Sequence, residues 1–225
     1  MYILVVDDDV FANTLVQFVL AKEGFDVKTT DNPWGAMRLI EDQEPDLLIL
    51  DVCMPHLNGF EFSQKLYKEG YEIPLIFMTI QGTIEAKLQG FDVGADDYIC
   101  KPYNHQELVA RVKAVMHRIK RSQAFVKQNV CVGRIELVPV DLKLIIDGNK
   151  SITLTPTEVK MLHILMSSSG QTINRDQLMV EVWDDDDTSS NIVDVYIRRL
   201  RTKLEEDPNR PHHIISVRGI GYKFI

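Results

Sequence analysis

The stretch that decides the fold is LLILDVCMP, from Leu47 to Pro55. Its first four residues are apolar, and a strand that is apolar at every position is typical of a parallel sheet covered on both faces. The apolar run ends at the carboxylate of Asp51, and a proline soon stops the chain. The pattern therefore predicts a buried strand whose polar end opens onto one edge of a sheet.

Outward from this strand, apolar runs alternate with helical patterns over residues 1–118. Strands are expected at residues 3–6, 27–29, 47–50, 74–78 and 98–99. A first helix is expected to begin near residue 11 and to end at Gly24, and further helices are expected at residues 35–40, 60–67, 84–93 and 106–118. In the first helix, Phe11, Leu15, Phe18 and Val19 fall on one face, which we expect to be the buried face. Five β/α units predict an α/β, flavodoxin-like domain with a five-stranded parallel sheet of order 2-1-3-4-5.

Polar side chains stand at the ends of four of these strands. They are Asp7, Asp8 and Asp9, then Asp51, Thr79 and Lys101. Ligands of open α/β sheets bind at this end, and the expected order makes the first and third strands neighbours. Asp8 and Asp51 are therefore expected side by side, where their ionised carboxylates repel each other. Magnesium suits such a site, because it accepts one or two carboxylates together with a phosphate oxygen.

Asp51 is then the natural acceptor of a phosphoryl group, through attack by its carboxylate. The metal, Lys101 and the Thr79 hydroxyl would stabilise charge on the transferring oxygens. An aspartate at a strand end also serves as a turn former or helix cap, and Asp9 fits that role. The combination of separated polar positions favours a phosphorylation site over the structural alternative.

Composition and charge limit the partners. The chain has 225 residues, 45% of them apolar, and a net charge of −8, which argues against nucleic-acid binding throughout. Residues 191–225 are the exception, with seven basic and four acidic residues, so a polyanion is expected near the C-terminus. The three cysteines lack metal-like spacing, and no apolar run approaches about 18 residues. We therefore expect a reduced, cytoplasmic chain that does not enter a membrane.

The pattern changes after residue 119. Residues 120–129 are polar and are expected to form a linker, or a helix extension that frays into one. Residues 130–225 then show short strands and a capped helix that starts at Thr155, with Pro156 at its first position and Glu158 at its third. Two more helices, at residues 175–182 and 192–204, precede a glycine hairpin. This order predicts an α+β winged-helix domain over residues 130–225, after a first domain of residues 1–119.

Several separated motifs together resemble a known family. ILVVDDD, LLILDVCMP, the strand end at Thr79 and GADDYICKP resemble the receiver domain of two-component response regulators. LTPTEVKML, NIVDVYIRRLRTKLE and VRGIGYKF resemble the winged-helix effector of the OmpR/PhoB subfamily. The resemblance implies a phosphorylation-dependent transcriptional regulator in which a sensor histidine kinase phosphorylates Asp51. It implies no ordinary enzyme, although the receiver assists its own phosphotransfer and dephosphorylation.

The resemblance also implies roles for residues around Asp51. Mg²⁺ would be bound by Asp8, Asp51 and the backbone carbonyl of Cys53, with help from Asp7 through water. Thr79 and the aromatic Tyr98 would respond to the phosphoryl group. Ile80 departs from the family pattern, which usually has a small residue there, and its side chain is expected to slow phosphoryl loss or loading by small donors.

A phosphorylated homodimer is the implied response. The matching residues are Lys87, Leu88, Phe91, Asp96, Asp97, Glu107, Ala110, Arg111 and Arg118. Ion pairs across the two-fold axis would join Lys87 to Glu107, Asp96 to Arg118, and Asp97 to Arg111. The alternative is an ordinary solvated helix face with mixed charges.

Double-stranded DNA is the implied target, in tandem half-sites. The candidate DNA contacts are Asn191, Tyr196, Arg198, Arg199, Arg201 and Arg218. The resemblance gives Arg198 and Arg201 as contacts to the DNA backbone. It gives Arg199 as a base reader and Arg218 as a minor-groove contact. A loop of four aspartates, Asp184, Asp185, Asp186 and Asp187, either contacts RNA polymerase or repels misplaced DNA.

Two rival functions stay open. A phosphatase with an aspartate nucleophile would want a second carboxylate two residues after Asp51, where this chain has Cys53. An atypical regulator would dimerise without phosphate, and Ile80 leaves room for that reading.

Overall fold

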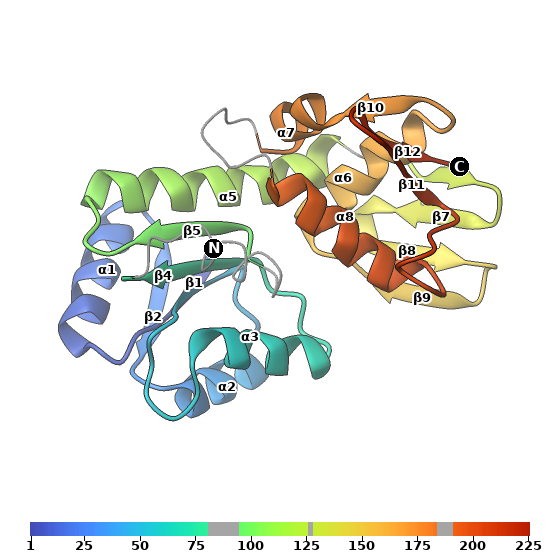
Figure 1. Ribbon diagram of the computed structural model, residues 1–225. Helices are drawn as coiled ribbons and strands as arrows, with labels where there is room; N and C mark the ends of the chain where they lie inside the picture. Colours follow the sequence, from blue (N-terminus) through green and yellow to red (C-terminus); the bar gives the residue numbers. More distant parts are fainter. Residues whose placement is uncertain (81–94, 126–127, 184–190) are drawn as a thin grey trace. The chain divides into compact units, whose positions relative to one another are not determined.

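The computed structural model describes residues 1–80, 95–125, 128–183 and 191–225 (Figure 1). For residues 118–125 and Asn191 only the backbone is described. The chain divides into two compact units, Met1–Met116 and His117–Ile225. Within the described residues, no helix combines the length and apolar character that a membrane span requires.

The first unit is built on a five-stranded parallel sheet. Its strands are β1 (Tyr2–Val6), β2 (Asp26–Thr30), β3 (Leu47–Asp51), β4 (Leu75–Thr79) and β5 (Asp97–Cys100). They lie in the order β2-β1-β3-β4-β5, which confirms the predicted flavodoxin-like topology. All five residues of β3 are buried, as expected for a strand with helices on both faces.

Helices pack around this sheet. They are α1 (Val10–Lys22), α2 (Pro33–Asp42), α3 (Gly59–Lys68) and α5 (His105–Phe125). The helix predicted at residues 84–93 lies outside the described residues. α3 begins with a capping box in which Asn58 and Glu61 bond each other's backbone N–H groups. A side chain at Gly59 would collide with the Asp51 carbonyl, so glycine allows α3 to start directly against the end of β3.

The predicted inner face of α1 is wrong. Phe11 is 87% exposed and Phe18 60% exposed, whereas Val16 and Leu20 are fully buried. The start of the helix explains the difference, because Asp9 caps α1 and sets its rotation. Asn13 then faces inward, and its amide donates to the carbonyls of Asp7 (2.7 Å) and Thr30 (3.0 Å). A polar residue thus faces the sheet, on a side of the helix that the predicted apolar face did not include.

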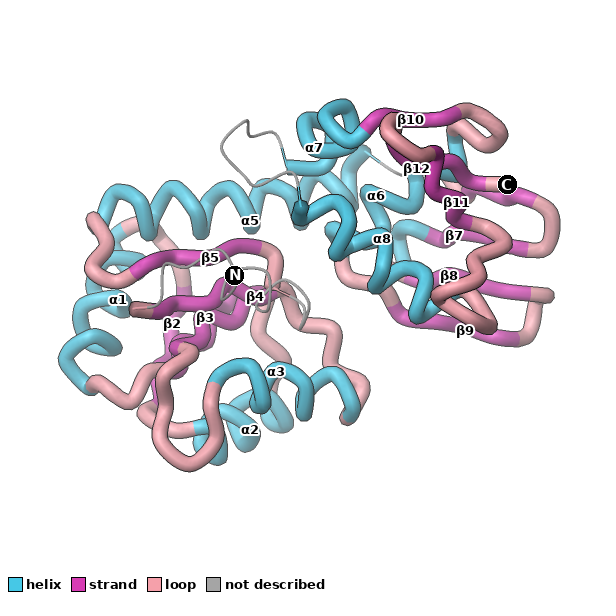
Figure 2. Tube along the Cα trace, viewed as in Figure 1, coloured by secondary structure: helices cyan, strands magenta, loops and turns pink. Residues whose placement is uncertain are grey.

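The second unit begins with a four-stranded antiparallel sheet (Figure 2). Its strands are β6 (Val130–Val132), β7 (Ile135–Val138), β8 (Lys143–Ile146) and β9 (Lys150–Thr153). A short 3-10 helix, Pro139–Asp141, joins β7 to β8. The predicted linker at residues 120–129 overlaps α5, which continues to Phe125.

Three helices and a second sheet complete this unit. The elements are α6 (Pro156–Ser167), β10 (Thr172–Asn174), α7 (Arg175–Trp183), α8 (Asn191–Leu204), β11 (Ile214–Val217) and β12 (Gly221–Phe224). The capping box predicted at Thr155 is present, with Glu158 at the third helical position. β11 and β12 form the expected hairpin, and Gly219 in its turn has a φ of 74°. Helices followed by this hairpin make a winged-helix arrangement.

Candidate functional site: an acidic pocket and a DNA-facing helix

Three carboxylates meet at the carboxyl end of the first sheet. Because β1 pairs with β3, the residues after Val6 lie beside the end of β3. One carboxylate oxygen from each of Asp7, Asp8 and Asp51 lies within 4.8 Å of the other two. Asp51 is only 3% exposed, whereas Asp8 is exposed at the mouth of the pocket. Residues 44 positions apart thus form one pocket, as the strand order predicted.

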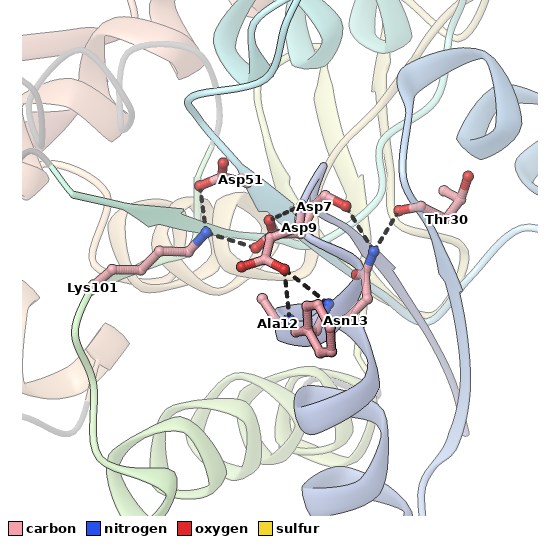
Figure 3. Close-up of polar contacts among 8 residues, drawn as sticks. Asp7, Asp9, Ala12, Asn13, Thr30, Asp51 and Lys101 are labelled. Atoms are coloured by element: carbon pink, nitrogen blue, oxygen red, sulfur yellow. Dashed lines mark hydrogen bonds and ion pairs between the residues drawn. The ribbon is translucent and has the colours of Figure 1, made fainter.

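Lys101 joins this pocket from the end of β5 (Figure 3). Its Nζ lies 2.6 Å from Asp7 Oδ2 and 3.1 Å from Asp51 Oδ1. Burial opposes the charged ammonium, but the hydrogen bond with Asp7 and the attraction of Asp51 raise the pKa of Lys101 overall. Burial also raises the pKa of Asp51, and the neighbouring Asp7 adds to that effect. The pocket therefore places several carboxylates around the ammonium group of Lys101.

The loop that carries Asp7, Asp8 and Asp9 is tied down by hydrogen bonds. Asp9 N–H donates to Asp7 Oδ1 at 3.0 Å, and Asp9 Oδ1 accepts from the N–H of Phe11 at 2.8 Å. The Asn13 amide holds the Asp7 carbonyl from below. Asn13 was not among the predicted site residues, because its role depends on backbone carbonyls that a sequence pattern does not show.

Thr79 and Tyr98 are buried on the neighbouring strands β4 and β5. Thr79 is fully buried at the end of β4, and its partner in the β4–β5 register is Cys100. Tyr98 is 4% exposed, packs against Phe77 with ring centroids 6.2 Å apart, and interacts with Thr79. Burial raises the pKa of Tyr98 to about 12, so its hydroxyl keeps its proton. Tyr98 thus faces inward in this structure.

The helix α8 of the second unit has one face exposed to solvent. On α8, Asp194, Arg198 and Thr202 are exposed on one arc, and Ile192, Tyr196 and Leu200 are buried on the opposite side. Arg218 is exposed in the turn between β11 and β12. An exposed helix face beside a hairpin with an arginine at its turn is the geometry of winged-helix DNA binding.

Comparisons with known proteins fit both units. Residues 3–113 match the response regulator receiver domain family, and residues 149–224 match the family of C-terminal domains of transcriptional regulatory proteins. The DNA-binding dual master transcriptional regulator RpaA of Synechocystis sp. is 39% identical over 98% of this chain and 93% of its own length. The chain is a two-component response regulator of the OmpR/PhoB type.

Two further proteins show the same full-length relationship to this response regulator. The alkaline phosphatase synthesis transcriptional regulatory protein SphR of Synechococcus elongatus is 32% identical over 98% of this chain and 90% of its own length. A solved structure of a RitR mutant covers 100% of this chain and 98% of its own, with 26% identity and a TM-score of 0.82. The response regulator combines a receiver with a DNA-binding domain, and phosphorylation of such a receiver controls transcription.

The pocket of the response regulator fits a hard divalent cation. Three carboxylates supply the oxygen ligands that such ions prefer, and Asp8 is open to solvent for an ion that keeps water ligands. Receivers of this family use an acidic cluster of this kind for Mg²⁺. The Cys53 side chain is exposed, and the predicted role of its carbonyl as a ligand stays a prediction.

The side chains of two predicted DNA contacts, Tyr196 and Arg199, point into the effector domain of the response regulator. Tyr196 is fully buried, with its ring 5.2 Å from that of Trp183 in an edge-to-face contact, and this placement argues against a DNA contact by its side chain. The Arg199 side chain is only 12% exposed, and its Nη2 lies 3.2 Å from Oε1 of the buried Glu158. Lys203 Nζ binds the other oxygen of Glu158 at 2.8 Å. Arg199 therefore joins α8 to α6, and this placement argues against base reading by its side chain.

Arg201 is also engaged inside the effector. Its Nε and Nη2 donate to the Ile214 carbonyl at 2.9 and 2.6 Å, and Nη2 donates to Ser216 Oγ at 3.0 Å. The guanidinium fixes β11 to α8, and a contact between Arg201 and the DNA backbone stays a prediction. Arg198 and Arg218 are exposed as predicted, and the Asn191 side chain lies outside the described residues.

The predicted dimer face of the response regulator is only partly described. Arg111 pairs within its own protomer, with Asp97 Oδ1 and Glu107 Oε1 each at 3.0 Å. Asp96 is 2% exposed, and its Oδ2 accepts a hydrogen bond from Leu75 N–H at 3.0 Å. Ala110 is exposed. Lys87, Leu88, Phe91, the Arg118 side chain and the loop from Asp184 to Asp187 lie outside the described residues.

Proposed function

We propose that Asp51 accepts a phosphoryl group from a histidine of a sensor kinase, and that Mg²⁺ bound by Asp8, Asp51 and the Cys53 carbonyl supports the transfer. A carboxylate oxygen of Asp51 attacks phosphorus and forms the P–O bond of an acyl phosphate, while the P–N bond to histidine breaks. The bound cation supplies charge neutralisation between the carboxylate and the phosphoryl oxygens.

The contact that carries this proposal is the position of Lys101 between Asp7 and Asp51. Its Nζ is held where charge on the entering phosphoryl oxygens would develop. The hydroxyl of Thr79, a buried residue at the end of β4 next to β3, is the second group that we assign to these oxygens. Tyr98 interacts with Thr79, so a movement of Thr79 toward the phosphoryl group would alter the position of Tyr98 and of the β5–α5 side of the receiver.

The output that we propose is a homodimer that binds tandem DNA half-sites about one helical turn apart. We assign Arg198 and Arg218 as DNA contacts, because Arg198 is exposed on α8 and Arg218 is exposed in the turn of the hairpin. Because both the kinase and the DNA act inside the cell, we place the protein in the cytoplasm. Contact of the loop at residues 184–187 with RNA polymerase is a further part of this proposal.

Acetyl phosphate with Mg²⁺ tests the proposal directly. Intact-mass measurement should show the mass of one phosphoryl group on the wild type, none on Asp51→Asn, and none after EDTA. Size-exclusion chromatography and DNA binding should then change only in the modified wild type. A modified protein that stays monomeric and binds DNA unchanged would refute the output, and modification of the Asp51→Asn variant would refute the acceptor.

The phosphatase reading makes a different prediction. It requires turnover of a phosphomonoester, with a second carboxylate where this chain has Cys53. We expect no release of phosphate from p-nitrophenyl phosphate above that of the Asp51→Asn variant. The receiver's own chemistry is limited to gaining and losing one phosphoryl group.

A further inference from the structure

A polar cluster joins three elements of the effector, α7, α8 and β12. The Tyr222 hydroxyl of β12 donates to Asp194 Oδ1 of α8 at 2.6 Å. Arg175, the first residue of α7, places Nε 2.8 Å from the same oxygen and Nη2 3.3 Å from the Tyr222 hydroxyl. One carboxylate oxygen thus receives a guanidinium and a phenol from two other elements.

The Tyr222 ring supports this cluster from below. The Arg175 guanidinium lies over the ring, 4.9 Å from its centroid, and that of Arg201 lies 5.8 Å from the same centroid. Tyr222 is 4% exposed, and burial raises its pKa to about 12. Its hydroxyl therefore stays protonated and keeps donating to Asp194. The cluster is fixed by ring stacking as well as by hydrogen bonds.

Asp194 and Arg175 would each be unfavourable alone. Asp194 is the one acidic residue of the α8 sequence, and its side chain is 47% exposed on the arc that carries Arg198. An unpaired carboxylate there would repel DNA phosphates. Arg175 stands at the N-terminus of α7, where the helix dipole disfavours a cation. Pairing resolves both conflicts and places the guanidinium at the edge of the exposed arc.

We propose that Arg175 is a DNA-phosphate contact of this effector, and that Asp194 and Tyr222 are positioning residues that hold it. The inference rests on the proposed binding of DNA by α8 and the hairpin. The Arg175 side chain is 34% exposed, and its Nη1 makes no hydrogen bond with any residue that the structure describes. The N–H groups of Nη1 can donate hydrogen bonds to a phosphate, and stacking on the Tyr222 ring orients the guanidinium before DNA binds.

The test uses the full-length chain and a DNA duplex that the wild type selects from a random library. Binding is measured by fluorescence anisotropy across a salt series. Arg175→Gln should weaken binding about tenfold and lower the slope of log K against log salt by about 0.9 per bound protomer. Arg175→Lys should keep the wild-type slope, because it keeps the charge. The double variant Arg175→Gln/Asp194→Asn should bind more tightly than Arg175→Gln, because it removes the unpaired carboxylate.

Arg134→Gln is the matched control. Arg134 also pairs with an aspartate, with its Nη1 3.3 Å from Asp147 Oδ1, but it lies in the turn between β6 and β7. This variant should keep the wild-type slope and affinity. A lower urea midpoint for Arg175→Gln with an unchanged salt slope would show a purely structural cluster and overturn the inference.

Arg198→Ala separates this inference from the proposed function. If Arg198→Ala weakens binding and Arg175→Gln does not, the phosphate contact of Arg175 fails and the use of α8 stands. If neither variant changes affinity or slope, DNA binding by this face of α8 fails as well.

Discussion

Replacement of Arg199 by glutamine tests whether this arginine stabilises the fold or reads a DNA base. The Arg199 guanidinium loses its contact with Glu158, which is fully buried, and its position over the Tyr196 ring, 4.9 Å from the centroid. An ion pair with a buried carboxylate and a cation–π contact together stabilise a fold by about 2–4 kcal/mol. Glu158 keeps Lys203 as a counter-ion, so the loss should lie toward the lower end of that range.

Trp183 provides the assay. Its ring packs on Tyr196, so its fluorescence reports unfolding of the effector unit. A Trp34→Phe background removes the signal of the other tryptophan. In urea, Arg199→Gln should unfold earlier by an amount that corresponds to about 2 kcal/mol. At urea concentrations where the variant is folded, its salt slope on DNA should equal that of the wild type.

Two results would contradict this reasoning. An unchanged urea midpoint would mean that the contact with Glu158 contributes nothing to the fold. An altered preference for one base pair in the selected duplex, with normal stability, would restore Arg199 as a base reader. Arg198→Gln is the control, because the Arg198 side chain is exposed on the same helix. This variant should keep the wild-type urea midpoint and lower the salt slope of DNA binding.

Three further predictions follow from the receiver and the effector. Ile80 is 68% exposed directly after Thr79, so Ile80→Ala should shorten the Asp51 phosphate lifetime or speed acetyl phosphate loading; equal lifetimes and loading rates would refute it. Lys101→Gln should slow loading of Asp51 at least tenfold, measured by intact mass over time, and a normal rate would remove Lys101 from the chemistry. Burial alone would raise the pKa of Glu205, but N–H donors from residues 212–214 lower it overall, so its stabilisation is present above the usual glutamate pKa and is lost as pH falls through the lowered pKa. Glu205→Gln should therefore lower stability by about 2 kcal/mol at neutral pH and by progressively less as the pH is lowered through the acid range, and a pH-independent difference in urea titrations would contradict this.

Sequence predicted the receiver pocket well because strand order alone assembles it. Because β1 and β3 are parallel neighbours, the residues at their carboxyl ends, Asp8 and Asp51, lie close together. Helix faces were less predictable. On α1, the cap at Asp9 and the amide of Asn13 set the rotation, and both act through backbone groups.

The arginines of α8 show the same limit. Arg198 and Arg199 are adjacent in sequence, yet a helix turns about 100° between them. One side chain therefore meets solvent, while the other reaches Glu158 on α6. Only the tertiary position of a buried carboxylate distinguishes the two. Asp194, Arg175 and Tyr222 come from three separate elements, so no local motif joined them.

The absence of a side chain at Gly59 has a consequence for motion in the receiver. The Asp51 carbonyl and the start of α3 lie so close that no side chain fits between them. We therefore expect the end of β3 and the start of α3 to keep their relative position when a phosphoryl group is attached. We expect the displacement to fall on the opposite wall of the pocket, where Ile80 follows β4 and Lys101 follows β5.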